Sequence, residues 1–220
     1  MWNEQIIMML LEGIKDTLYM TLTSTLIGYV IGLPMGILLT VTDKDGIHPN
    51  AAVYKVLDVI ANLIRSVPFL ILLIVLIPFT RFLIGRSYGP TATIVPLVIA
   101  AAPYIARMVE SSLKEVDAGV IEAARSMGAS NFTIVTKVML VEARTSLIVG
   151  ATISLGTILG YSAMAGTVGG GGLGDIAIRY GYTRWQTDIM IVTVILLVIL
   201  FQIFQTIGMK RSEEHTSELQ

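Results

Sequence analysis

Long apolar runs separated by short polar intervals dominate this chain. Five of these runs are long enough for helices that cross a bilayer, and they cover residues 17–41, 56–79, 91–109, 146–168 and 189–207. A hydrocarbon core about 30 Å thick needs roughly 20 mostly apolar residues in an α-helix. The pattern therefore predicts an all-α, polytopic membrane protein with five transmembrane helices.

The N-terminal stretch 1–13 lacks the basic segment of a typical signal peptide, because the first basic residue of the chain is Lys15. Trp2, Ile6, Met9 and Leu10 share one helical face, which predicts a short helix lying in the membrane interface. Ordinary packing of the same residues against the bundle is the alternative.

The first span carries glycines at a spacing of four residues, Gly28, Gly32 and Gly36. These positions form a small face against which another helix can pack closely. Pro34 predicts a kink in this span. The polar interval 42–50 contains turn signals and predicts a loop.

The second span contains the polar residues Asn62, Arg65 and Ser66, followed by Pro68. An arginine at the centre of a transmembrane helix costs about 2.5–3.5 kcal/mol on insertion scales. Arg65 is therefore expected to face the bundle interior, a water-filled cavity or a carboxylate. The alternative is that Arg65 lies at the interface and extends its charge to water.

The third span contains Pro96 and Pro103, so neighbouring helices must satisfy the carbonyls that these prolines free. The fourth span is rich in small residues and is expected near the centre of the bundle; its glycines are Gly150, Gly156, Gly160 and Gly166. Within it, Tyr161-Ser162-Ala163-Met164 offers a hydroxyl and a flexible thioether. As a bare pattern, such a run serves packing more often than substrate binding.

The glycine run 169–174 matches no nucleotide-binding motif. A P-loop requires Lys and then Ser or Thr after Gly174, but Asp175 and Ile176 stand there. A formal GxGxxG match follows a membrane helix and lies in no βαβ unit. We expect a flexible loop outside the membrane, with Trp185 anchoring the fifth span at the interface.

Composition supports a membrane protein, since 54% of the residues are hydrophobic and 14% are charged, against about 25% charged in soluble domains. The net charge of −1 argues against nucleic-acid binding. The absence of cysteine excludes disulfides and thiol chemistry. The two histidines, His48 and His215, are far apart and form no metal site by themselves, so no metal and no cofactor are predicted.

The interval 116–129 is the longest polar stretch between spans. Its Ala and Glu content predicts a helix over 118–127. Gly128 can adopt the left-handed conformation that ends a helix. The interval thus predicts a rigid, exposed protrusion that carries the run Glu122-Ala123-Ala124.

The pattern Glu122-Ala123-Ala124-x-x-x-Gly128, followed by Val138-Met139-Leu140, resembles the EAA loop of the membrane permease subunits of ABC importers. An amphipathic loop helix that contains EAA by chance is the alternative. The family usually has proline directly after that Leu and often again four residues on. Here these positions are Val141 and Thr145, so we expect a smoother run into the fourth span.

Three further runs resemble the methionine-importer branch of this family: the residues from Asn62 to Phe69, the run Tyr161–Met164, and the Gly-Gly-Leu-Gly that ends at Gly174. The resemblance implies a translocation path or gate at Tyr161, Ser162, Met164, Asn62, Arg65 and Ser66. It implies coupling to an ATPase at Glu122, Ala123, Ala124 and Gly128.

The resemblance implies a type I ABC importer permease that passes methionine across the cytoplasmic membrane by alternating access. The chain has no nucleotide motif and no nucleophile–base pair, so it is not an enzyme and needs a separate ATPase. The expected partners are two ATPase copies, a second permease copy in a two-fold homodimer, an extracytoplasmic methionine-binding protein and the bilayer. Alternatives are a permease for another small solute, such as an osmoprotectant, and a standalone channel or secondary transporter.

Basic residues indicate orientation. With the EAA loop in the cytoplasm, the inner segments hold Lys44, Lys55, Arg107, Lys114, Arg125, Lys137, Arg144, Lys210 and Arg211, and the outer segments hold Lys15, Arg81, Arg86, Arg179 and Arg184. This excess places the N-terminus outside and the C-terminus in the cytoplasm.

The tail 211–220 abandons the composition of the permease domain, 1–210. It resembles the in-frame translation of a sequencing-library adapter, so we expect a sequence artefact in place of the native C-terminus and give His215 no function. A short acidic disordered tail is the alternative.

Overall fold

The computed structural model describes residues 4–217, which form helices and connecting turns with no β-strand among them. Along the chain these elements are α1 (Glu4–Thr42), α2 (Ala51–Ser66), α3 (Phe69–Val75), α4 (Ile77–Ile84), α5 (Pro90–Lys114), α6 (Ala118–Ser126), α7 (Asn131–Thr133), π-helix η1 (Ile134–Met139), α8 (Leu140–Glu142), α9 (Arg144–Ala165), 3-10 helix η2 (Gly166–Val168), α10 (Gly172–Ile176), π-helix η3 (Ala177–Tyr182) and α11 (Thr187–Ser217).

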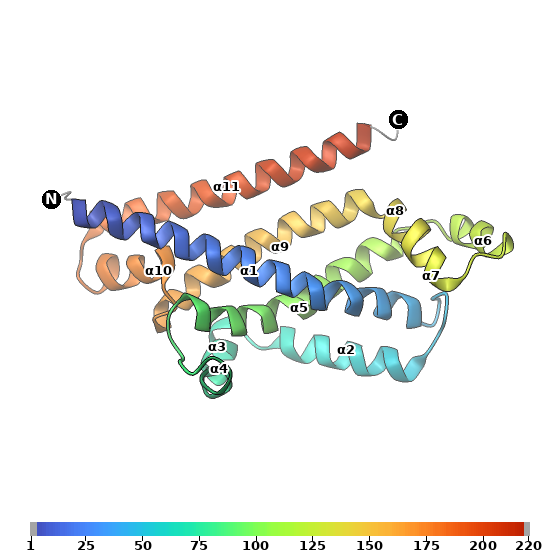
Figure 1. The fold of residues 1–220 in the computed structure, drawn as a ribbon, viewed down its shortest axis with the longest axis horizontal. Helices are drawn as coiled ribbons and strands as arrows, with labels where there is room; N and C mark the ends of the chain where they lie inside the picture. Colours follow the sequence, from blue (N-terminus) through green and yellow to red (C-terminus); the bar gives the residue numbers. More distant parts are fainter. Residues whose placement is uncertain (1–3, 218–220) are drawn as a thin grey trace.

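Within the described part of the chain, four helical runs are long and apolar enough to cross a membrane: Glu4–Thr42, Pro90–Lys114, Arg144–Tyr182 and Thr187–Glu214. A fifth candidate is the pair α2 and α3, bent by 101°. The long helices follow the long axis of the molecule, and α6 lies at the end opposite to the starts of α1 and α11 (Figure 1). Counting the bent pair as one span gives the predicted five crossings.

The second span, expected over 56–79, is thus divided into helices by a sharp bend. Val67 has extended backbone angles, φ −85° and ψ 124°, and separates α2 from α3. Pro68 explains the break, since it disfavours helical angles in the residue before it and has no N–H to donate. The chain turns sharply here and places Phe69 against the core.

The glycine face of α1 packs against α5, as predicted. A methyl group at Gly32 would lie 2.6 Å from the Ala102 carbonyl oxygen, and one at Gly36 equally close to the Ala106 carbonyl oxygen. The backbones of the two helices thus approach more closely than any larger residue allows. The helix continues through Pro34 without a break.

The sequence predicted a short interfacial helix at the N-terminus, but the described residues there form the first turns of α1. Leu10 is buried and packs with Leu173, Ile176 and Ile189, and Ile6 and Met9 lie against the same cluster. The packing alternative holds for these residues. Trp2 lies outside the described residues.

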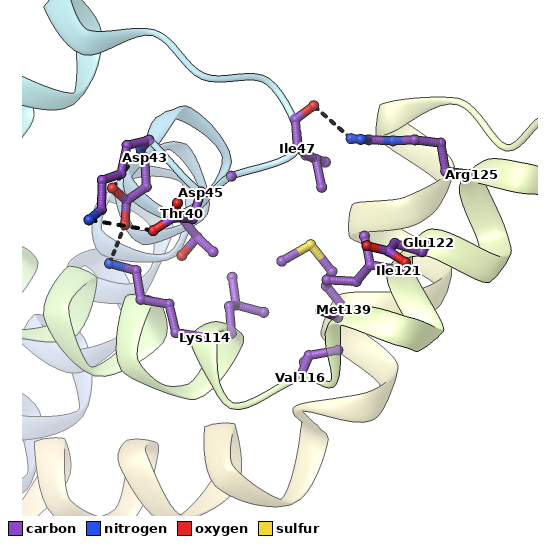
Figure 2. A pocket seen from close by; sticks show the side chains of 14 residues that line it. Thr40, Asp43, Asp45, Ile47, Lys114, Val116, Ile121, Glu122, Arg125 and Met139 are labelled. Atoms are coloured by element: carbon purple, nitrogen blue, oxygen red, sulfur yellow. Dashed lines mark hydrogen bonds and ion pairs between the residues drawn. The ribbon is translucent and has the colours of Figure 1, made fainter.

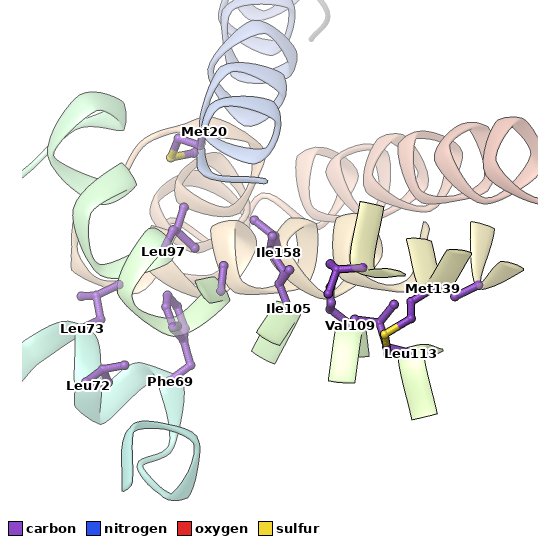
Figure 3. Packing of buried hydrophobic residues seen from close by; sticks show 14 of the residues in the cluster. Met20, Phe69, Leu72, Leu73, Leu97, Ile105, Val109, Leu113, Met139 and Ile158 are labelled. Atoms are coloured by element: carbon purple, nitrogen blue, oxygen red, sulfur yellow. The ribbon is translucent and has the colours of Figure 1, made fainter. Parts of the chain in front are cut away.

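The main apolar core follows α5, whose residues Leu97, Ile105 and Val109 meet Met20 of α1 and Ile158 of α9 (Figure 3). Buried side chains from five other elements, α1, α3, α6, η1 and α9, belong to the same cluster. The helix α5 is thus the central scaffold on which the neighbouring spans and the segment after α6 are mounted.

The glycine run 169–174, expected as a flexible loop, is packed against its neighbours: Gly170, Gly172 and Gly174 are buried, and Gly172 begins α10 (Gly172–Ile176). Gly169, Gly171 and Gly172 have positive φ angles. The Leu173 N–H donates to the Thr17 hydroxyl (2.9 Å), and the Gly89 N–H donates to the Gly169 carbonyl (2.9 Å). Glycine is needed here because the backbone takes left-handed angles among close neighbours.

The last helix, α11, extends to Ser217. Residues 211–217 are thus part of this helix. Residues 218–220 lie outside the described part of the chain.

Candidate coupling and translocation sites

The helix expected over 118–127 is α6. Asp117 caps its N-terminus by accepting from the Gly119 N–H (2.8 Å), and Gly128 has φ +82° directly after its C-terminal turn. Both ends are thus fixed by local sequence. The helix has a defined direction before any partner binds it.

The EAA residues divide between surface and core. Glu122 and Ala123 are exposed, whereas Ala124 is only 5% exposed and belongs to the main core cluster. Met127 and Phe132 extend this surface with side chains that are mostly exposed. The structure therefore presents Glu122 and Ala123 outward and uses Ala124 to seat α6.

A pocket of about 590 Å³ lies between α6 and the loop that joins α1 to α2. Its walls include Glu122, Ile121 and Met139, and Figure 2 shows Arg125 reaching across it toward the loop. The Arg125 guanidinium donates to the Ile47 carbonyl (2.9 Å). This bond connects α6 to the α1–α2 loop.

The segment after α6 has neither of the prolines usual in the family. From Asn131 to Ala165 only Ala143 lies outside helical structure, with φ −78° and ψ 3°. The segment therefore runs into α9 with a single non-helical residue, and the π-helix η1 makes it irregular. Ile134, Val135 and Met139 of η1 are buried and hold the segment on the core.

Sequence reasoning missed a chain of ion pairs near the same end of the molecule. It consists of Asp43, Lys114, Glu110, Arg107 and Asp58, and we term it the ion-pair chain. Lys114 bonds to Asp43 (2.6 Å) and Glu110 (2.8 Å), and Glu110 bonds to Arg107 (2.6 Å). The spacing of Arg107, Glu110 and Lys114 by three and four residues is the signal that could have revealed its α5 part.

The Lys114 ammonium shifts the pKa of Asp43, the residue that follows α1. Its hydrogen bond to the carboxylate lowers the pKa of Asp43 below the ordinary value, and the bond from the Lys44 N–H adds to this effect. Both interactions favour the charged carboxylate over the neutral acid.

The polar residues of the second span occupy the exposed side of α2. Asn62 accepts from Arg107 (3.0 Å) and donates to Asp58 (3.1 Å). The Ser66 hydroxyl donates to the Asn62 carbonyl (2.7 Å). Arg65 is exposed, so within this single chain it faces outward and not into a core.

The run Tyr161–Met164 in the fourth span contains both buried and exposed side chains. Ser162 is 1% exposed and its hydroxyl donates to the Leu159 carbonyl (2.7 Å). Met164 is 51% exposed, and the Tyr161 ring stacks on Phe69 of α3. The structure thus brings Tyr161 next to the bend after Ser66, while Ser162 faces the interior of the chain.

Comparison with known families decides what kind of protein carries these features. Residues 28–213 match the family of binding-protein-dependent transport system inner membrane components. The chain belongs to this family. As an inner-membrane component with several apolar helices, it is a multi-pass membrane protein of the inner membrane.

Relatives within the binding-protein-dependent transport family are similar over most of the chain. The "Probable D-methionine transport system permease protein MetI" of Vibrio cholerae is 48% identical over 200 residues, covering 91% of this chain and 89% of the relative. The D-methionine transport system permease protein MetI of Escherichia coli is 51% identical over 164 residues, covering 74% and 76%.

Solved structures agree with this family. A chain of the MetNI methionine ABC transporter in an inward-facing conformation superimposes with a TM-score of 0.95 at 47% identity, covering 97% of this chain and 99% of that chain. An amino acid ABC transporter with histidines gives 0.79 at 21% identity, covering 96% and 95%, and shows the shared fold.

Proposed function

We propose that this chain is the permease subunit of an ATP-driven importer and forms, with a second copy, the path for methionine across the cytoplasmic membrane. The observation that carries the proposal is the similarity to the MetNI chain, which extends over nearly the whole of both chains. The curated relatives also bear D-methionine transport names.

ATP hydrolysis takes place on a separate ATPase, of which two copies serve the homodimer. Each ATPase contacts α6 through the outward residues Glu122 and Ala123, and Gly128 sets the direction of the protrusion. Ala124 contributes indirectly, because its burial holds α6 on the core. An extracytoplasmic methionine-binding protein delivers the solute at the opposite end.

The gate lies where α2, α3 and α9 meet. Tyr161 and Met164 on α9 and Asn62, Arg65 and Ser66 on α2 face the path between the two copies. The exposure of Arg65 and Met164 in the single chain supports this assignment. Ser162 supports the path from behind, since it is buried. With α6 in the cytoplasm, the basic residues around it support an external N-terminus and a cytoplasmic C-terminus.

Uptake in proteoliposomes tests the function. The permease, the ATPase and the binding protein are reconstituted, and ATP-dependent uptake of labelled methionine and of labelled glycine betaine is measured in parallel. We expect uptake of methionine alone. Uptake of glycine betaine alone would identify an osmoprotectant permease, and uptake that persists with an inactive ATPase would identify a standalone transporter.

A second experiment tests the coupling surface. Glu122→Lys combined with Gly128→Pro reverses a charge on α6 and removes the left-handed turn after it. We expect loss of ATPase copurification from a permease that still inserts into the membrane. Glu4→Lys, at the end of the molecule opposite to α6, is the control for the charge reversal and should leave copurification unchanged. Equal copurification of the two variants would refute the assignment.

A further inference from the structure

Polar contacts, joined by the α1–α2 loop, lead from α6 to the proposed gate. It begins at Arg125, whose guanidinium donates to the Ile47 carbonyl in the α1–α2 loop. The Ile47 side chain packs against the main core cluster. The same loop starts at Asp43, so a displacement of α6 acts directly on the segment that carries this carboxylate.

The ion-pair chain continues from that carboxylate along α5. Asp43 pairs with Lys114 (2.6 Å), and Lys114 pairs with Glu110 (2.8 Å). Glu110 is only 5% exposed and also pairs with Arg107. Loss of either cationic partner leaves this buried carboxylate poorly compensated. A displacement of Lys114 therefore also changes the position of Arg107.

The chain ends on α2, four residues before the gate. Arg107 pairs with the Asp58 carboxylate and donates to the Asn62 side-chain oxygen (3.0 Å). Lys114 also lies over the Tyr54 ring at 5.9 Å. Only Ala61 of α2 is fully buried, so polar contacts supply much of what positions this helix.

We propose that the ion-pair chain transmits the movement of α6 to α2, with Arg107 and Glu110 as positioning residues for the gate. The inference rests on the proposed function and deepens it. Through these contacts, α6 acts on α2 by way of the α1–α2 loop and α5, in addition to its covalent link to α9. The helix α2 ends at the Val67–Pro68 bend, so its rotation displaces Arg65 and the Phe69–Tyr161 pair together.

A static brace between α2 and α5 is the competing explanation, and the two make different predictions. A brace contributes stability alone, so its loss lowers the unfolding temperature and leaves the methionine transported per ATP hydrolysed unchanged. A transmitting chain links two distant sites, so its loss lowers that ratio while hydrolysis continues.

The test uses the permease–ATPase complex with the binding protein in proteoliposomes. Arg125→Ala removes the contact between α6 and the α1–α2 loop, and Asp58→Asn weakens the contact between α5 and α2. Lys55→Ala is the control, since it removes an exposed charge on α2 that does not belong to the ion-pair chain. We expect each of the first two to lower methionine transported per ATP by roughly 5-fold or more, the lower range for coupled sites, and Lys55→Ala to change nothing. An unchanged ratio in both variants would overturn the inference.

The double variant sharpens the result. Arg125 and Asp58 lie on different helices and share no contact, so independent effects would multiply. A common route predicts that Arg125→Ala with Asp58→Asn is no worse than the stronger single variant. Multiplying effects would overturn the common route, and absence of methionine uptake by the unaltered complex would instead refute the proposed function.

A structural measurement is independent of the solute. The sequence contains no cysteine, so Lys55→Cys gives one spin label on α2 in each copy. We expect binding of a non-hydrolysable nucleotide to the ATPase to change the distance between the two labels, and this change to be lost with Arg125→Ala. A change of full size in that variant, or no change in the unaltered complex, would refute transmission to α2.

Discussion

The ring of Tyr161 on α9 stacks on the ring of Phe69 on α3, with centroids 4.4 Å apart and planes within 5° of parallel. Phe69 is the first residue after the Pro68 bend, and its side chain is buried. The stack therefore fastens the broken second span to the fourth span. It joins two runs whose resemblance to the methionine-importer branch was recognised separately in the sequence.

We expect this stack to contribute measurable coupling. In a double-mutant cycle with Tyr161→Ala and Phe69→Ala, aromatic pairs of this kind give about 0.5–1.5 kcal/mol beyond burial. Unfolding of the permease in detergent supplies the four free energies. Tyr161→Phe keeps the ring and should preserve the coupling with Phe69; additive losses in the cycle would mean that the rings contribute by burial alone.

Gly32 tests the close contact between α1 and α5. Gly32→Ala places a methyl group 2.6 Å from the Ala102 carbonyl oxygen, where only backbone movement can relieve the clash. Overpacking typically costs about 1–3 kcal/mol, so the unfolding temperature in detergent should fall clearly. Gly150→Ala is the matched control, since its methyl group would meet Met108 at 3.5 Å, an ordinary contact. Equal effects of the two changes would contradict the role of this glycine face.

Sequence patterns predicted the features that depend on local chemistry. The spacing of Gly28, Gly32 and Gly36 predicted a face for helix packing, and Gly128 predicted the left-handed turn after α6. These succeed because periodicity and allowed backbone angles are properties of the chain itself. The same is true of α6, whose composition favours a helix in this interval.

Hydropathy treats 56–79 as one run, because an apolar average ignores the local break that Pro68 causes. Other features depend on residues that are distant in the sequence and were not predictable from local patterns. Burial of the glycine run 169–174 depends on Thr17 and Gly89, which lie far away in the sequence. The contact between Arg107 and Asp58 likewise requires knowing that α2 lies beside α5.

The Asp43–Lys114 pair predicts a pH dependence. The pKa of Asp43 is lowered in the folded protein by the hydrogen bond from Lys114, so the pair stabilises the fold above the ordinary Asp pKa of 3.8. That contribution should diminish as the pH drops below this value and vanish below the folded-state pKa. Unfolding of the wild type and Asp43→Asn should therefore differ at neutral pH and converge in acid. A difference that stays constant down to low pH would contradict a titrating pair.

The hydrogen bond between Thr17 and Leu173 predicts a large effect from a small change. The Thr17 hydroxyl is the acceptor for the Leu173 N–H at 2.9 Å, and Thr17→Val leaves that buried N–H without it. An unsatisfied buried donor costs about 1–3 kcal/mol, so the free energy of unfolding in detergent should fall by this order. Thr25→Val is the control, because the Thr25 hydroxyl bonds only within its own helix, to the Thr21 carbonyl. We expect the control to stay near the wild type and Thr17→Ser to retain the bond; similar losses for both valine variants would show that the turn at 169–174 does not depend on Thr17.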